Sequence, residues 1–401
     1  MLKPPTCLML AVSLLAWCLG CGGASPSVAQ IPGIQGAAPV DPATAGSLTV
    51  HLVQDGLPGP LSHLNLVLGS LEVRVGGAWR PVPLAVPGQP VDLLAGTGQA
   101  PLLLASKVPW PAGLNDGLRF TFGPGSTVQL AEEDADTSHP LAAPQQLTGA
   151  MGLPGSFYVA AHQDTDLWIT FPVDGAAVPD PAADGGYVLA PGPVRGYDKA
   201  ATGAISGALA VRDGAALQGV PITAQLEARD GQPGAAIAFR TVASDAEGHF
   251  TLDLLPKGCT WCVVGQPVQG GAAYYAQASP GFAMGHAPYD QYETSLSFSP
   301  AALSGSVSGT VAAAPGLGQE DRVDLVQEIP VGGVPCRFVV ASAEVTPRDG
   351  HLAFSFPSVP PGIYSAVLND YTQVVDQGRV DQAEPTARFA VSAGNTTTLT
   401  F

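Results

Sequence analysis

The sequence predicts an all-β protein built from tandem β-sandwich domains. Glycine and proline account for 49 and 39 of the 401 residues, well above the roughly 12% of average usage, and they interrupt any helical periodicity. Short runs that alternate apolar and polar residues lie between them, such as Ser47–Val53 and Leu167–Phe171. Alternation with a period of two is typical of half-buried strands. Hydrophobic residues form 46% of the chain, which is enough for a core in each of several domains.

The chain is acidic, with a net charge of −17. Much of this charge reflects the scarcity of lysine, since the only lysines are Lys3, Lys107, Lys199 and Lys257. An acidic surface repels phosphate backbones and anionic headgroups. We therefore expect no nucleic-acid partner.

The N-terminus has the composition of a secretory signal peptide. Lys3 precedes an apolar segment, Cys7–Trp17, which is shorter than the roughly 20 residues needed to span a bilayer. The residues Leu19-Gly20-Cys21 that follow resemble the lipobox of bacterial lipoproteins, although Cys18 stands where that family usually has Leu, Val or Ile. The resemblance implies cleavage after residue 20 and a diacylglycerol on the Cys21 thiol. One alternative is acylation at Cys18, which would place the bulky Trp17 directly before the cleavage site. The other is ordinary signal cleavage near Ala29 and a product without an anchor.

Two acyl chains would anchor the protein stably, because each buried methylene contributes about 0.8 kcal/mol. The lipoprotein resemblance, with Gly22 and not Asp after Cys21, implies an exported protein lipid-anchored to the cell envelope, in the outer membrane if the organism has one. Residues 21–45 are rich in Gly, Ala, Pro, Ser and Gln. We interpret them as a flexible linker that reaches roughly 25–30 Å.

Residues 46–200 form the first predicted domain. The motifs that occur in order along it are Asp55, Trp79, Asp92-Leu93-Leu94, Pro111-Ala112-Gly113 and Val194. In this order they resemble an uncharacterised β domain family found in bacterial and archaeal lipoproteins. That family has no assigned activity, so the resemblance implies no catalytic residue.

Residues 201–300 carry a turn and strand signature. The turn Asp245-Ala246-Glu247-Gly248 reverses the chain, because glycine adopts positive φ without strain. Phe250 and Leu252 then share one face of a strand, and Leu255-Pro256-Lys257-Gly258 makes the next turn. This segment resembles carboxypeptidase regulatory-like domains, which implies a transthyretin-like sandwich. Such domains accompany a peptidase but do not contain its zinc ligands.

Residues 301–401 repeat that plan in a diverged form, as a second regulatory-like sandwich. Ser306–Val311 corresponds to Ala204–Leu209, and Arg348–Phe354 corresponds to Ala246–Leu252. The repeat length of about 100 residues is that of a duplicated domain and not of a solenoid.

The sequence predicts no enzyme, cofactor or metal. It contains no Gly-x-Ser-x-Gly, His-Glu-x-x-His, Ser-x-x-Lys or Gly-Lys-Ser/Thr motif, and its seven histidines are scattered. The acidic run Glu132–Asp136 lacks the spacing of a calcium loop, and we interpret it as a solvated loop.

Three cysteines, Cys259, Cys262 and Cys336, accompany Cys21 in the processed chain. Cys259 and Cys262 lie in a predicted strand, where residues three apart are about 10 Å apart at Cα. A disulfide needs about 4.4–6.8 Å, so a bond between these two requires a bulge. We expect a structural disulfide that uses one or both, with Cys336 either a thiol or paired across domains.

The function that unites these features is that of a non-enzymatic cell-envelope lipoprotein, a structural, adhesive or presenting module. Its expected partners are membrane lipid, through the acylated cysteine, and polysaccharide or other envelope proteins. The alternative is a carbohydrate-binding surface lipoprotein in which Trp110, Tyr274 and Tyr275 stack on sugar rings. Trp79 and Trp168 lie at alternating strand positions and are expected in the core.

Overall fold

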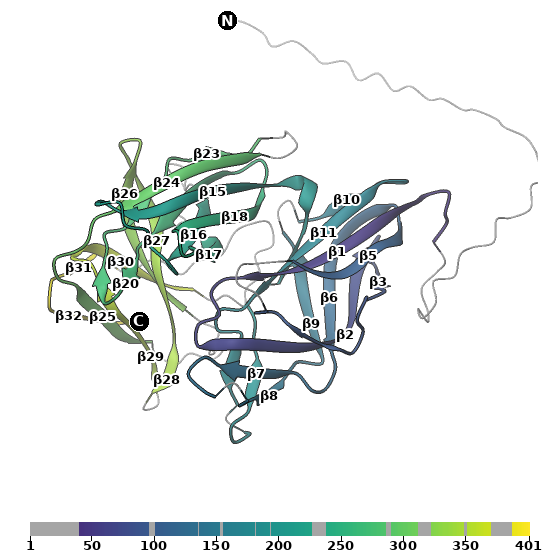
Figure 1. Ribbon diagram of the computed structural model, residues 1–401, viewed down its shortest axis with the longest axis horizontal. Helices are drawn as coiled ribbons and strands as arrows, with labels where there is room; N and C mark the ends of the chain where they lie inside the picture. Colours follow the sequence, from purple (N-terminus) through teal and green to yellow (C-terminus); the bar gives the residue numbers. More distant parts are fainter. Residues whose placement is uncertain are drawn as a thin grey trace, which may run out of the picture.

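The computed structural model (Figure 1) describes the residues 40–95, 101–134, 136–152, 155–180, 182–192, 194–226, 238–285, 290–311, 322–348, 351–369 and 387–401. The regular structure of these residues is all strand apart from one 3-10 turn, η1 (Lys199–Ala201). The predicted all-β class with tandem sandwiches is thus confirmed. No helix among the described residues is long and apolar enough to cross a membrane. The predicted signal peptide and Cys21 lie outside the described residues.

The strands form three groups, which we call modules 1, 2 and 3, and each pairs only within its own group. Module 1 contains β1–β14, whose bounds are β1 (Ala45–Asp55), β2 (Leu61–Val75), β3 (Ala78–Val82), β4 (Pro90–Asp92), β5 (Leu102–Pro111), β6 (Gly113–Phe122), β7 (Thr127–Leu130), β8 (His139–Ala142), β9 (Gln146–Met151), β10 (Phe157–Val159), β11 (Asp164–Pro172), β12 (Ala177–Pro179), β13 (Tyr187–Leu189) and β14 (Arg195–Asp198).

Module 1 is one 14-stranded sheet, and its main path runs β12-β13-β8-β7-β2-β6-β9-β14-β11-β1-β5. The long strand β2 pairs with β7 and β4 through its first half and with β3 and β6 through its second half. β1 lies parallel to β11 and antiparallel to β5. Apolar residues from β1, β2, β6, β8 and β11 meet in one core, because alternate side chains of each strand point inward.

Module 2 is a two-sheet sandwich over a single apolar core. One sheet has the order β18-β15-β24, and the other has the order β17-β16-β19-β22 with β23 added to β19. The bounds are β15 (Thr202–Val211), β16 (Pro221–Leu226), β17 (Ala238–Ala243), β18 (His249–Pro256), β19 (Thr260–Gly265), β20 (Val268–Gln269), β21 (Ala272–Ala273), β22 (Gln277–Ala278), β23 (Phe282–Ala283) and β24 (Gln291–Phe298).

Module 3 is a second sandwich with sheets β28-β29-β25-β32 and β27-β26-β30-β31. Its bounds are β25 (Gly305–Val311), β26 (Arg322–Val331), β27 (Val334–Glu344), β28 (Thr346–Arg348), β29 (His351–Val359), β30 (Gly362–Asn369), β31 (Phe389–Val391) and β32 (Thr396–Thr400). β15 and β25 have the same surroundings, since each has an antiparallel neighbour on one side and a parallel one on the other.

A glycine in the middle of β15 and of β25 marks this shared plan. Gly207 pairs with Phe250 and Gly309 pairs with Phe354, and each phenyl ring lies over the glycine opposite it. A Cβ at either glycine would collide with that ring and with a carbonyl of the parallel strand. The Ser-Gly step that recurs in the sequence therefore has a packing cause.

We predict that Gly207→Ala and Gly309→Ala each destabilise the protein by about 2 kcal/mol or more, because an overfilled core displaces the phenyl ring and the neighbouring strand. Scanning calorimetry measures the fall in Tm. The control is Gly285→Ala, since the atoms nearest to a Cβ there are the Asp290 carboxylate oxygens at 3.8 Å. Equal Tm values for all three variants would contradict this explanation.

Candidate functional site

The structure corrects one predicted ligand-stacking residue. Trp110 is only 2% exposed and belongs to the core of module 1. Its indole Nε1 donates a hydrogen bond to Asn115 Oδ1 at 3.0 Å. No face of this ring is open to a sugar, so the interpretation of Trp110 as a stacking residue is wrong.

The other aromatic residues divide by exposure. Tyr274 is half-buried against the module 2 core, whereas Tyr275 is 39% exposed. Trp79 and Trp168, expected in the core, are only half-buried. The Arg119 guanidinium lies 4.5 Å from the centre of the Trp79 ring, and the Lys199 ammonium lies 4.3 Å from that of Trp168. Both rings thus pack against cations at the surface of module 1.

The three cysteines lie on two sides of one sheet. Cys259 is half-buried against the core of module 2, and burial raises the pKa of its thiol. Cys262 and Cys336 are buried together in a separate apolar cluster between modules 2 and 3. Among the described residues, no group of three or more His, Cys, Asp or Glu side chains is arranged to hold a metal.

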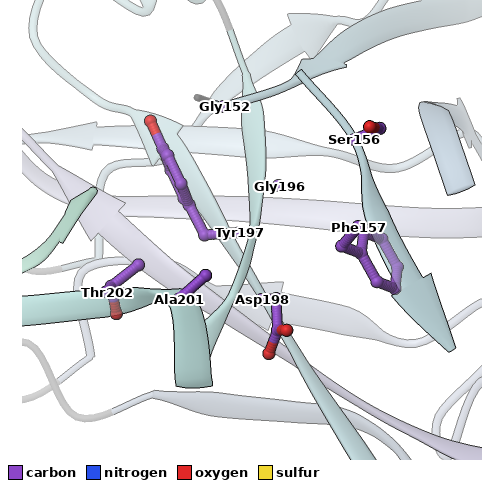
Figure 2. Close-up of a pocket in the computed structure, with 8 residues that line it drawn as sticks. All are labelled: Gly152, Ser156, Phe157, Gly196, Tyr197, Asp198, Ala201 and Thr202. Atoms are coloured by element: carbon purple, nitrogen blue, oxygen red, sulfur yellow. The ribbon is translucent and has the colours of Figure 1, made fainter. Parts of the chain in front are cut away.

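A small hollow lies where module 1 leads into module 2 through η1 (Figure 2). It is lined by Gly152, Ser156, Phe157, Gly196, Tyr197, Asp198, Ala201 and Thr202, and it holds no more than a water-sized molecule. Figure 2 shows the Tyr197 ring and the Asp198 carboxylate projecting in opposite directions from β14. Asp198 accepts from Ala200 N at 3.0 Å and Thr202 donates to Lys199 O at 2.9 Å, so these polar groups cap the turn.

Two buried polar side chains, those of Arg240 and Gln225, bind across the boundaries between modules. Arg240 in β17 is 1% exposed, and its Nη1 donates to Gln54 O at 2.8 Å and lies 2.9 Å from Asp55 Oδ1, both at the end of β1. Its Nη2 contacts Asp253 Oδ1 in β18 at 3.0 Å. Gly56 N also donates to Thr241 O at 3.2 Å. We call this set the Arg240 clasp, and it joins module 1 to module 2.

A bulge in β18 turns Asp253 and Leu254 toward module 1. The register of β15 and β18 shifts at this point, and Leu254 adopts φ +58, which is strained for a residue with a Cβ. Leu254 thereby leaves the module 2 core and packs with Val53 and Tyr197 of module 1. Burial alone would lower the Arg240 pKa, but the carboxylates of Asp55 and Asp253 outweigh it and raise that pKa. The guanidinium therefore stays charged.

Modules 2 and 3 are joined by a buried amide. Gln225 in β16 is 0% exposed, and its Nε2 donates to Val339 O at 2.6 Å while its Oε1 accepts from Val339 N at 3.0 Å. One side chain thus satisfies both backbone groups of a β27 residue. Gln266 Nε2 also donates to Tyr364 Oη at 3.2 Å.

Module 3 also touches module 1. The guanidinium of Arg322, at the start of β26, forms an ion pair with Asp174 in the turn after β11. Gly175 lies against the side chains of Arg322 and Glu344, with φ +67. Each module therefore contacts both others.

Sequence reasoning missed Arg240, Gln225 and Arg322. The sequence marks Asp55 only as one of the ordered motifs of residues 46–200. One feature of the sequence does point to Arg240, since it lies inside the largely apolar run Ala238–Ala243. A charged side chain at an inward position of a strand requires a partner of opposite charge.

No protein-family model matches the chain, and no curated protein matches it. Among solved structures, a streptococcal ancillary pilin aligns at 12% identity over 89% of this chain and 98% of that one, with a TM-score of 0.21. The Bacillus anthracis TIE protein aligns at 11% identity over 89% of this chain, which spans about half (51%) of that protein, with a TM-score of 0.21. A putative adhesin from Bacteroides ovatus aligns at 10% identity over 49% of this chain and 89% of that one, with a TM-score of 0.18. TM-scores near 0.2 carry no functional information.

We predict that Arg240→Met lowers the free energy of unfolding by about 3 kcal/mol, because it removes the buried cation that binds both Asp55 and Asp253 and leaves Asp253 with the more distant Lys199 ammonium at 3.8 Å. Urea unfolding measures the loss. The matched control is Arg74→Met, whose ion pair with Asp116 is 41% and 36% exposed and contributes about 1 kcal/mol or less. Equal losses in the two variants would show that the clasp does not stabilise the protein.

Stability should fall between pH 10 and pH 12. Burial raises the pKa of Tyr197 and of Tyr364 to about 12, whereas a phenol in the unfolded chain ionises near pH 10. The unfolded state therefore releases these protons first, so the stabilisation is complete below pH 10 and is lost as the pH rises toward 12. Each tyrosine contributes on the order of 2 kcal/mol.

Urea unfolding at pH 9 and at pH 11.5 measures this loss. Tyr197→Phe should lose less stability between the two values than the wild type does. Tyr158→Phe removes a phenol from a side chain that is 62% exposed and should lose as much as the wild type. An equal loss in all three proteins would rule out Tyr197 as a source.

Proposed function

We propose that this chain is a non-enzymatic cell-envelope lipoprotein whose three β modules act as one rigid presenting or structural unit. The pairwise contact of the modules carries the proposal. Module 1 binds module 2 through Arg240, module 2 binds module 3 through Gln225, and module 3 binds module 1 through Arg322. A chain of domains joined only end to end would bend at each linker, whereas contacts on all three sides oppose such bending.

The buried polar side chains support the same proposal. Arg240 and Gln225 are the largest polar side chains among the buried residues, and both bind another module. The Asp198 carboxylate and the Thr202 hydroxyl in the hollow are occupied by backbone groups of η1. These groups hold the architecture together, as a structural unit requires.

In this proposal the linker 21–45 lifts the unit from the membrane, and the Cys21 acyl chains hold it there. Carbohydrate binding remains the alternative prediction. Of its three residues Tyr275 is exposed and Tyr274 is half-buried.

Metabolic labelling of the full chain with an alkyne fatty acid, expressed in a bacterium, tests the anchor. We expect the wild type to be acylated and found in the membrane fraction. Cys21→Ser should lose the label and leave that fraction. Cys18→Ser, which removes the neighbouring cysteine, should keep both. A labelled Cys21→Ser protein or an unlabelled wild type would refute the proposed anchor.

A further inference from the structure

The strand β19 presents two buried faces to two different modules. Trp261 and Val263 lie in the core of module 2, and Cys262 and Val264 lie on the opposite face. Cys262 is 0% exposed although it points away from its own core. This face is covered by module 3, through an apolar cluster that contains Ile329, Cys336 and Phe338.

The Gln225 amide fixes how this face meets module 3. Gln225 is the Cα partner of Cys262 across the β16–β19 pair, so the two side chains are neighbours on the same face. The same amide binds both backbone groups of Val339, which lies in β27 three residues beyond Cys336. Because β19 also contacts β27 directly, Cys262 and Cys336 are brought into one cluster from the two sides of the interface.

Cys259 lies on the other side of the same sheet. It precedes β19 and packs against the core of module 2, whereas Cys336 belongs to the cluster on the opposite face. Of the two cysteines in module 2, only Cys262 is in the cluster with Cys336.

We propose that Cys262 and Cys336 are the sites of a disulfide that joins module 2 to module 3. The oxidant is a disulfide of the glutathione or dithiol-oxidase class. One cysteine thiolate attacks this disulfide, forms a mixed disulfide and releases the first thiol. The second cysteine thiolate then displaces the other thiol. One S–S bond forms in the protein, and the two electrons and two protons pass to the oxidant. Since both cysteines are buried, the reaction precedes or accompanies docking of the two modules.

Peptide mapping of the full chain tests the pairing. The reduced and unfolded chain is refolded in the presence of oxidised glutathione, so that oxidation accompanies docking of the modules, and it is then denatured, alkylated and cut with trypsin without reductant. Cleavage at Lys257, Arg322 and Arg337 gives peptide 258–322, with Cys259 and Cys262, and peptide 323–337, with Cys336. We expect these two peptides to be joined. They should stay joined in Cys259→Ser and separate in Cys262→Ala and in Cys336→Ala.

Recovery of Cys336 as an alkylated thiol in the wild type would overturn the proposal. Peptides that stay joined in Cys262→Ala but separate in Cys259→Ser would overturn it too, because Cys259 would then be the partner. Cys259→Ser is the matched control, since it keeps both proposed cysteines whether or not Cys262→Ala folds. The outcome is independent of acylation at Cys21, so this inference and the proposed function fail separately.

Discussion

The docking of module 1 on module 2 depends on one guanidinium that is both charged and buried away from water. Arg240 is almost fully buried, and an isolated buried charge costs several kcal/mol. Its acceptors come from two modules, because Gln54 and Asp55 belong to β1 and Asp253 belongs to β18. Asp253 belongs to the same module as Arg240, so the contribution of module 1 is the Asp55 carboxylate and the Gln54 carbonyl, which reach the guanidinium only when the two modules meet in this orientation. The gain from such a site is mainly in orientation, since apolar packing of similar volume would stabilise an interface equally well.

The contrast between the two sandwich modules shows how this interface is placed. Both have a bulge on the strand beside the Ser-Gly step, in β18 and in β29. In module 2 the bulge carries Asp253 and Leu254, which face module 1. In module 3 the corresponding residues are Pro357 and Ser358, which offer neither a carboxylate nor a large apolar side chain. The same local geometry therefore serves as a docking element in only one copy.

Module 2 is the centre of the arrangement. It uses β17 and β18 against module 1, and β16 and β19 against module 3. The ion pair between Arg322 and Asp174 then brings module 3 back to module 1. The three modules form a closed group and not an extended string of spacers, which supports a presenting unit of fixed shape.

Strands and turns could be predicted from the sequence because they depend on local patterns. The alternation in Ser47–Val53 corresponds to β1, the glycine of the Asp245–Gly248 turn has φ +80, and Phe250 and Leu252 are buried. Trp110 was misplaced because its hydrogen-bond partner Asn115 sits on the next strand, which alternation alone does not reveal. Arg240 and Gln225 were missed for a related reason, since their partners lie 186 and 114 residues away in sequence. Contacts between modules produce no periodic pattern of apolar and polar residues in the sequence.

Scanning calorimetry of the full chain tests most directly whether the modules form one unit. If the inter-module contacts couple them, the protein unfolds in a single transition whose calorimetric and van't Hoff enthalpies agree. Two or three separate transitions, each belonging to one module, would contradict the account.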